Sequence, residues 1–202
     1  TIAKLMAGFF DADDGRIYFG DQDVKSIPTS QLMKHVAYVA QDNFLFDTSI
    51  RENLKIAKAD ATDEEIQAAL KAANCLELIE RLPEGLNSNA GDCGKFLSGG
   101  ERQRITLARA MLADAQCIIL DEATAYADVE NEAKIQEALS RLMKDKTLIV
   151  VAHRLNTIVG ADQIMVLGHG KIESIGTHKE LIQNSSAYQK LWQSYSGKEV
   201  VE

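Results

Sequence analysis

Hydrophobic residues follow two different spacings along the chain, and each spacing predicts a different kind of element. Short, nearly uninterrupted apolar runs are typical of buried strands, and they predict strands at 16–19, 36–40, 116–120 and 147–152. Two more runs, at 163–167 and 171–175, flank Gly168-His-Gly170. A glycine-containing turn between two such runs predicts a β-hairpin.

A helical spacing of apolar residues takes over between residue 49 and about residue 82, where Ile66 and Leu70 lie one helical turn apart. Within this stretch Thr62 precedes Glu65 by three residues, which predicts a capping box at a helix start. Further helices are predicted at 101–113, 129–144, 178–183 and 186–195.

The alternation of strands and helices predicts an α/β fold with a mainly parallel sheet. A mostly helical block at about 43–112 interrupts this alternation. We therefore expect one domain, with a core formed by 1–42 and 113–202 and a helical subdomain inserted at 43–112.

Composition narrows the class of protein. The chain has 202 residues, of which 46% are hydrophobic and 26% are charged, values that are ordinary for a water-soluble domain. Its net charge of -8 argues against a nucleic-acid partner, because such partners require a basic surface. The three cysteines, Cys75, Cys93 and Cys117, form no CxxC pair, which favours reduced thiols over a metal site or disulfide. No apolar run reaches membrane-spanning length, and there is no secretory signal pattern.

Polar side chains follow three of the predicted strands at the point where each strand ends. Gln41 follows 36–40, Asp121 and Glu122 follow 116–120, and His153 follows 147–152. The carboxyl ends of parallel strands meet at one edge of a sheet, where ligands bind, so these residues could surround a metal-bound phosphate. Ordinary strand ends are often polar too, and the spacing alone leaves both interpretations open.

Four segments resemble the ATP-binding cassette (ABC) ATPases, in the order that this family has them. Tyr38-Val-Ala-Gln41 is similar to the Q-loop, Leu97-Ser-Gly-Gly-Glu-Arg-Gln-Arg104 to the signature motif, Ile118-Ile-Leu-Asp-Glu122 to Walker B, and Ala152-His-Arg-Leu155 to the switch-histidine segment. The resemblance covers essentially the whole chain. It implies a P-loop NTPase-like fold, with ATP and Mg²⁺ as cofactors.

The resemblance also implies roles for the strand-end residues, consistent with phosphoryl transfer by positioning and charge stabilisation. Asp121 is expected to hold Mg²⁺, through water, with Gln41 sensing the metal or the water. Glu122 is expected to orient or deprotonate the attacking water. His153 is expected to donate to γ-phosphate oxygens.

Ser98-Gly-Gly-Glu101 has two interpretations that hold together. Serine followed three residues later by glutamate is a capping box, which accounts for a helix start. The two glycines, Gly99 and Gly100, also allow a phosphate to approach backbone N–H groups at the positive end of a helix. The family resemblance implies that this segment serves the ATP held by a second cassette in a head-to-tail dimer. Asp128 occupies the position of the D-loop, at the same dimer contact.

The phosphate loop itself is missing, because no part of the chain matches GxxxxGK[ST]. Thr1 aligns with the threonine that follows the family's metal-binding serine or threonine. We therefore expect a piece of a longer polypeptide, without the N-terminal strands and phosphate loop. It should be inactive alone, and uncovered sheet edges or apolar surface should make it self-associate.

Three functions remain in competition. The first is the ATPase domain of an exporter-type ABC transporter, because the Phe44–Asn53 run, the 89–94 loop and the Gly176–Leu181 stretch resemble exporters. Its partners are a second cassette and a transmembrane domain on the same full-length chain, at the cytoplasmic face of the cell membrane. The second is a soluble ABC ATPase of DNA repair or translation. The third is a non-catalytic cassette.

Overall fold

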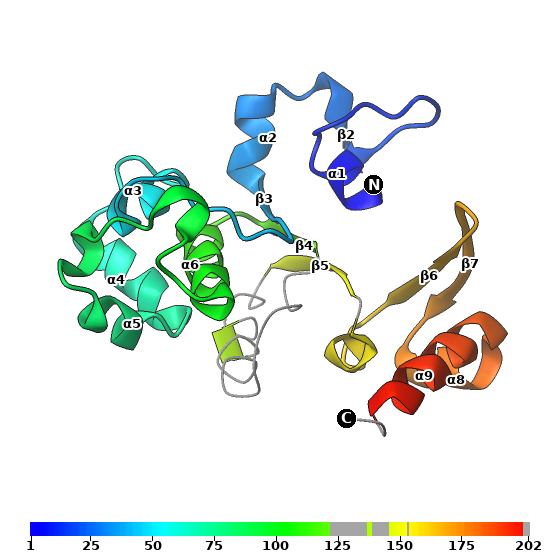
Figure 1. Cartoon of the computed structure of the whole chain (residues 1–202). Coiled ribbons are helices and arrows are strands. Elements are labelled where there is room, and N and C mark those ends of the chain that lie inside the picture. Colours follow the sequence, from blue (N-terminus) through cyan, green and yellow to red (C-terminus); the bar gives the residue numbers. More distant parts are fainter. Residues whose placement is uncertain (122–136, 139–145, 153, 200–202) are drawn as a thin grey trace. The chain divides into compact units, whose positions relative to one another are not determined.

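The computed structural model describes residues 1–121, 137–138, 146–152 and 154–199. The chain divides into two compact units, Thr1–Val151 and Ala152–Glu202 (Figure 1). The helix predicted at 129–144 lies outside the described residues, apart from 137–138. The single domain predicted for the whole chain stays a prediction.

A parallel three-stranded sheet forms the centre of the first unit. It consists of β3 (Val36–Val39), β4 (Cys117–Asp121) and β5 (Thr147–Val151), in the order β3-β4-β5. The register pairs Val39 with Leu120 and Asp121 with Val151. The α/β class and the parallel sheet predicted from the sequence are thereby confirmed.

The two faces of this sheet bury different partners. Ile118 and Leu120 point into a core shared with the helical block, whereas Cys117 and Ile119 pack on the opposite face against Ala3. This alternation follows from the two-residue period of a strand. The second face is covered by α1 (Ile2–Met6) and α2 (Thr29–His35), beside the hairpin of β1 (Tyr18–Phe19) and β2 (Gln22–Asp23).

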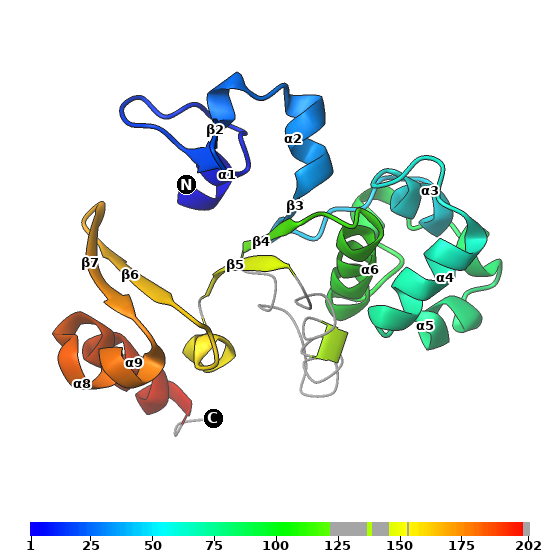
Figure 2. The same ribbon diagram turned by 180° about the vertical axis from the view of Figure 1, so that it is seen from behind.

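The α-helices of the helical block gather on one side of β3 and β4 in the view from behind (Figure 2). They are α3 (Ile50–Lys55), α4 (Asp63–Ala72), α5 (Leu76–Arg81) and α6 (Gly99–Leu112). The helical stretch predicted at 49–82 is therefore three short helices. Asn74, with φ of 54°, adopts a left-handed conformation that separates α4 from α5.

The interior of this block is apolar and closely packed. Ile66 and Leu70 of α4 are fully buried together with Ile105 of α6, as the helical spacing predicted. Burial of each such side chain contributes about 2 kcal/mol. The predicted capping box of Thr62 and Glu65 is present at the start of α4.

In the second unit a short 3-10 helix (Leu155–Ile158) is followed by a hairpin and two helices. Strands β6 (Ile164–Gly168) and β7 (Lys171–Gly176) are antiparallel, and α8 (His178–Asn184) and α9 (Ser186–Glu199) follow them. The two turn residues, His169 and Gly170, have φ of 51° and 74°. Positive φ at both positions is typical of a type I′ turn, and the predicted hairpin is confirmed.

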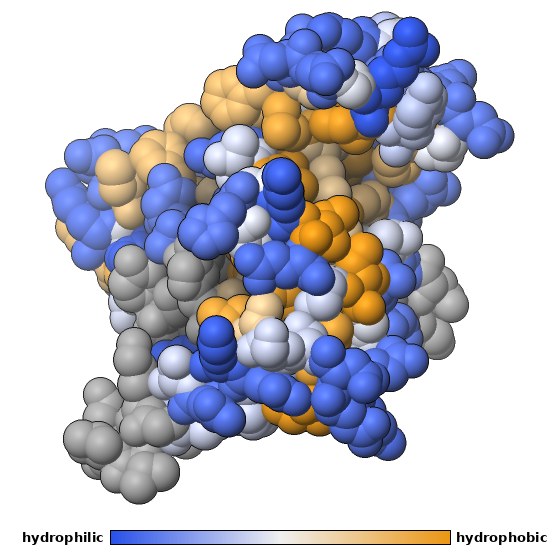
Figure 3. All heavy atoms as spheres, turned by 90° about the vertical axis from the view of Figure 1, so that its right-hand side faces the viewer, coloured by the Kyte–Doolittle hydropathy of each residue, from blue (hydrophilic) through white to orange (hydrophobic). Residues whose placement is uncertain are grey.

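The hairpin is apolar on both faces. Ile164 and Val166 pack against Leu181 and Tyr188 on the inner face. The outer face carries a second set of apolar side chains, each 44–55% exposed: Met165, Leu167, Ile172 and Ile175. Met165 and Leu167 alternate with the inner residues of β6, and a register shift between Val166 and Leu167 puts Ile172 and Ile175, three residues apart, on the same face. Figure 3 views the side of the molecule that lies to the right in Figure 1 and shows hydrophobic residues open to solvent there. Among the described residues, none of the helices combines the length and hydropathy that crossing a bilayer requires.

Candidate nucleotide site

One edge of the parallel sheet collects the ends of β3 and β4. Asp121 is the last residue of β4, and Gln41 follows two residues after Val39, the residue that pairs with Leu120. Because the strands are parallel and in register, Gln41 and Asp121 belong to the same sheet edge. The expected meeting of an amide and a carboxylate at one edge therefore agrees with the strand pairing.

The Asp121 carboxylate has a hydrogen-bond partner that no sequence motif singled out. The hydroxyl of Tyr38 donates a hydrogen bond to Oδ2 of Asp121, across 83 residues of sequence. Burial raises the pKa of the Tyr38 hydroxyl, and the hydrogen bond to Asp121 and the charges of Asp121 and Asp42 raise it further. The phenol therefore stays protonated, and it remains a donor to the carboxylate at any physiological pH.

The loop after Gln41 is anchored to α6. The side chain of Asn43 is buried and donates to the backbone oxygen of Gln41 over 3.2 Å, while its Oδ1 accepts from the hydroxyl of Thr106 at 2.9 Å. Asn43 adopts a positive φ of 47°, a conformation that asparagine tolerates better than most residues. The position of Gln41 thus depends on contacts with a helix more than 60 residues away in sequence.

A second anchor fixes the same loop to α3 and α6. Asn53 is fully buried, and its Oδ1 accepts from the backbone N–H of Phe46 at 2.8 Å and from Arg109 at 3.0 Å. Arg109 also donates to the backbone oxygens of Asn53 and Phe44, at 2.9 and 3.3 Å. These contacts hold the exposed aromatic pair Phe44 and Phe46, whose rings meet edge to face, at the surface of the helical block.

The start of α6 has the predicted capping box. The Ser98 hydroxyl accepts from the backbone N–H of Glu101 at 3.3 Å, and the Glu101 carboxylate accepts from the backbone N–H of Ser98 at 2.8 Å. The other carboxylate oxygen of Glu101 accepts from Arg81 at 2.8 Å. The burial of Glu101 favours a higher pKa, but the hydrogen bonds from Ser98 and the contact with Arg81 outweigh it and lower the pKa.

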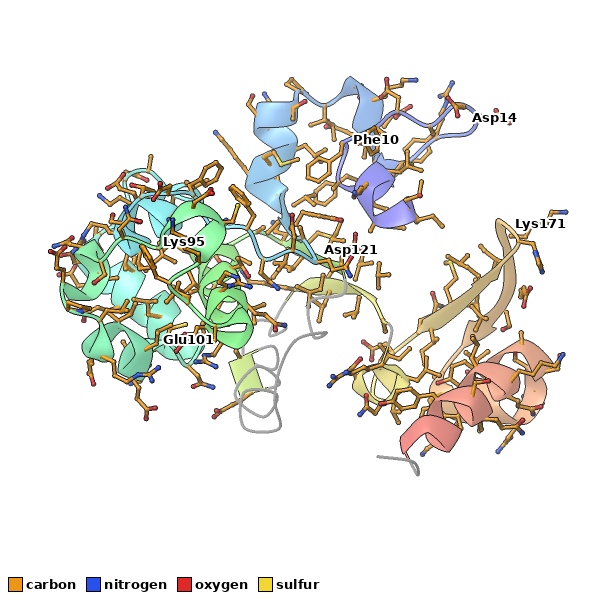
Figure 4. The ribbon with its side chains drawn as sticks, viewed as in Figure 1. Phe10, Asp14, Lys95, Glu101, Asp121 and Lys171 are labelled. Atoms are coloured by element: carbon orange, nitrogen blue, oxygen red, sulfur yellow. The ribbon has the colours of Figure 1, made fainter. Side chains whose placement is uncertain are left out.

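The structure does not bring the helix tip and the sheet edge together. Figure 4 labels Glu101 in the first turn of α6 and Asp121 at the end of β4, at separate places in the first unit. The helix between them has 14 residues, which corresponds to about 21 Å of axial length. Ser98, Gly99, Gly100 and Glu101 therefore form one group, and Gln41 and Asp121 form another.

The donors at the sheet edge suit a hard divalent cation. Asp121 supplies carboxylate oxygens and Gln41 an amide oxygen, which are the ligand types that Mg²⁺ takes. Within the described residues, no cluster of three or more His, Cys, Asp or Glu side chains could enclose a metal by itself. Mg²⁺ is commonly held by one or two carboxylates together with substrate phosphates, so this sparse donor set fits it.

The other residues expected at the site divide into two kinds. Thr1 is exposed and precedes α1, where its backbone oxygen accepts from the N–H of Leu5 at 3.0 Å. Glu122, Asp128 and His153 lie outside the described residues. Tyr38 is the residue that sequence reasoning missed, since the sequence indicates it only as part of the strand and motif that lead to Gln41.

Comparison with known proteins assigns the chain to a family. A family profile described as ABC transporter matches residues 1–125. An ABC transporter ATP-binding protein of Bacillus subtilis, YfiC, is 44% identical over 194 residues, which are 96% of this chain and 32% of that protein. The mycobactin import ATP-binding/permease protein IrtA of Mycobacterium tuberculosis is 44% identical over 200 residues, which are 99% of this chain and 23% of that protein.

A solved structure gives the same result. The ATP-bound structure of a bacterial Atm1-family ABC exporter matches with a TM-score of 0.91 and 33% identity, over 96% of this chain and 34% of that one. The chain thus spans about a third or less of the length of these relatives. The matches cover the strands, the helical block and the motifs described above, and the chain therefore belongs to the ABC transporter family, as an ATP-binding domain of its exporter type.

Proposed function

We propose that the chain binds and hydrolyses ATP as the motor domain of a longer transporter polypeptide, in which two such domains share each nucleotide site. The observation that carries the proposal is the parallel register of β3 and β4, which assigns Gln41 and Asp121 to one sheet edge. In open α/β sheets, this carboxyl edge is where nucleotides bind.

Each residue of the edge has a role in phosphoryl transfer. Bound Mg²⁺ would neutralise charge on the phosphate oxygens. Asp121 holds the ion, through water, and Gln41 responds to the ion or to the water. Glu122 orients the attacking water and accepts its proton, and His153 donates to the γ-phosphate.

The tip of α6 completes the site of a second cassette. Gly99 is partly exposed at this tip while Gly100 is buried, so the phosphate would approach the backbone at Gly99. The capping box of Ser98 and Glu101 holds this turn in place. Because the tip lies apart from Asp121 within one chain, the phosphate that it contacts belongs to the neighbouring subunit. A head-to-tail pair of chains satisfies both groups of residues at once.

The lengths of the relatives support a transmembrane domain on the same polypeptide, since this chain matches 32% of one ATP-binding protein and 23% of an ATP-binding/permease protein. The chain would then lie at the cytoplasmic face of the membrane. No part of its sequence matches GxxxxGK[ST], so the 202 residues alone should turn over ATP negligibly. The names of relatives include both mycobactin import and lipid A-core flipping, and the proposal therefore concerns ATP hydrolysis and names no cargo.

The first experiment tests hydrolysis in the transporter polypeptide that includes its phosphate loop. Glu122→Gln should lower kcat by about 100-fold or more, because it removes the group that activates water. Binding of Mg·ATP should be retained, since the amide keeps the shape of the side chain. The exposed Glu64→Gln in α4 is a matched control and should leave kcat unchanged. A Glu122→Gln protein with wild-type turnover contradicts the proposal.

The second experiment tests the shared site by mixing two inactive variants. Gly99→Asp places a negative charge where the phosphate should lie, at a helix position that tolerates an acidic residue. A mixture of Glu122→Gln and Gly99→Asp chains should recover turnover, because one of the two sites in the mixed dimer then combines an intact edge with an intact tip. Recovery fails if the edge and the tip act within one chain.

A further inference from the structure

Tyr38 occupies a position in the sheet from which it reaches the end of the neighbouring strand. It pairs in register with Ile119 of β4, and Asp121 lies two residues further along that strand. Side chains two residues apart share a face, so Tyr38 and Asp121 lie diagonally on the face covered by α1. The hydroxyl of Tyr38 donates to Oδ2 of Asp121.

The tyrosine ring is held by its own packing. Its edge-to-face contact with Phe9 has a centroid distance of 5.0 Å and an interplanar angle of 68°. Tyr38 also packs against the buried cluster that includes Val36 and Ile119. A ring fixed in this way presents its hydroxyl at a defined place, without relying on Asp121 to position it.

The orientation of the Asp121 carboxylate depends on Tyr38 more than the position of the Tyr38 ring depends on Asp121. Within residues 1–121, 137–138, 146–152 and 154–199, no Lys, Arg or His forms an ion pair with Asp121. Asp121 is also the final residue of β4, where it pairs in register with Val151 of β5. The phenol is thus the described side chain that fixes the orientation of this carboxylate.

We propose that Tyr38 is a positioning residue for the magnesium-binding carboxylate of Asp121. The proposal rests on the function proposed above. The phenol occupies one of about four lone-pair sites of the carboxylate, on Oδ2, and leaves the other sites, including both on Oδ1, available to the hydrated ion that Asp121 would hold. Hydrogen-bond partners of this kind change metal affinity by about 10- to 100-fold when they are removed.

The test measures nucleotide affinity with and without metal, in the transporter polypeptide that includes its phosphate loop. The probe is ADP with a fluorescent ribose label, titrated in Mg²⁺ and again in EDTA. Tyr38→Phe keeps the ring that packs on Phe9 and removes only the hydroxyl. Tyr18→Phe is the matched control, because Tyr18 is 58% exposed in the β1–β2 hairpin. Asp121→Asn reports the loss of the carboxylate charge.

We expect Tyr38→Phe to weaken ADP binding about 10-fold in Mg²⁺ and to leave it unchanged in EDTA. Tyr18→Phe should bind ADP with wild-type affinity both in Mg²⁺ and in EDTA. Adding Tyr38→Phe to Asp121→Asn should cause no further loss of ADP affinity in Mg²⁺, because the hydroxyl then has no carboxylate to orient. A Tyr38→Phe protein that matches Tyr18→Phe overturns the proposal. Equal weakening in Mg²⁺ and EDTA also overturns it, since a purely structural role would act on both.

A second measurement keeps the Tyr38 hydroxyl, and it tests the positioning role even if the Tyr38→Phe protein fails to fold. Fluorotyrosine incorporated in place of tyrosine keeps the hydroxyl, and the fluorine resonance assigned to Tyr38 should move when Mg²⁺ joins bound ADP. A resonance that stays fixed while Mg²⁺ tightens ADP binding overturns the positioning role. If Mg²⁺ has no effect on wild-type ADP affinity and Asp121→Asn changes nothing, the proposed function fails and the positioning role fails with it.

Discussion

The tip of α6 and the edge of the parallel sheet both offer groups to a phosphate, but they are held in different ways. At the tip, Ser98 and Glu101 are three residues apart and bond to each other's backbone. At the edge, Asp121 is oriented by Tyr38, which is 83 residues away in sequence. The tip is therefore set by a local stretch of chain, whereas the edge exists only after the sheet has formed.

This difference predicts how each region responds to damage. Loss of a capping residue loosens one helix turn and leaves the rest of the chain folded. Loss of a long-range contact changes the position of segments that come from distant parts of the sequence. Substitutions in the long-range contacts that hold the loop after β3 to α3 and α6 should therefore lower the free energy of unfolding most. Substitutions at the tip of α6 should lower it less.

The largest effect is expected from Asn53→Ala. This change leaves the Phe46 N–H and the Arg109 guanidinium without the buried oxygen that they share. We expect it to lower the free energy of unfolding by about 3 kcal/mol. Asn87→Ala, at an exposed residue that contacts Arg51, is the control and should change stability by less than about 0.5 kcal/mol.

Denaturant unfolding followed by far-UV circular dichroism measures both variants. The fluorescence of Trp192, the one tryptophan of the sequence, reports the 152–202 unit separately. Equal stabilities of Asn53→Ala and Asn87→Ala would show that the buried connection between loop and helix is not a principal support of either region.

A smaller effect is expected from Ser98→Ala. The change removes the hydroxyl that caps α6 and should cost about 1 kcal/mol. Hydrogen exchange should quicken in the first turn of α6 and stay unchanged in β4. Ser30→Ala, in the exposed first turn of α2, provides a comparison in which no capping hydroxyl is lost. Faster exchange in β4 would contradict the local character of the tip.

The smallest effect is expected from the charge of Glu101. The folded state lowers the pKa of Glu101 from its usual 4.5, so the ionised carboxylate stabilises the fold above pH 4.5. That contribution is lost as the pH falls below 4.5, through the lower pKa of the folded state. Glu101→Gln keeps the capping hydrogen bond but lacks the charge.

The stability difference between wild type and Glu101→Gln should therefore be present at neutral pH and disappear on acidification. It should also shrink in high salt, because Arg81 is 67% exposed. Unfolding curves at a series of pH values measure it. A difference that grows as the pH falls would have the opposite sign and would refute the assignment.

The same contrast explains which parts of the fold could be predicted. The capping boxes, the strands at 36–40, 116–120 and 147–152 and the hairpin turn depend on residues close in sequence, and the structure confirms them. The sequence did not predict α2, since its helical pattern is short and lies next to a strand. It predicted a helical stretch at 49–82 with a helix start at Thr62, where the structure has three helices, separated by residues 56–62 and by the left-handed Asn74.

In the candidate site, too, local features could be predicted from the sequence and long-range contacts could not. The grouping of Ser98 to Glu101 and the strand-end positions of Gln41 and Asp121 followed from local patterns. The link between Tyr38 and Asp121 depends on the register of β3 against β4, which no local pattern specifies. The anchoring of Asn43 by Thr106 likewise requires the packing of α6 against the loop.

The outer face of the β6–β7 hairpin has a consequence for oxidative chemistry. Met165 is 44% exposed there, beside the aliphatic side chains of Leu167 and Ile175. Oxidation by peroxide would convert its thioether into a polar sulfoxide in the middle of an apolar surface. Any surface that binds this face would shield the sulfur. The rate at which peroxide oxidises Met165 therefore reports whether the outer face of the hairpin is covered.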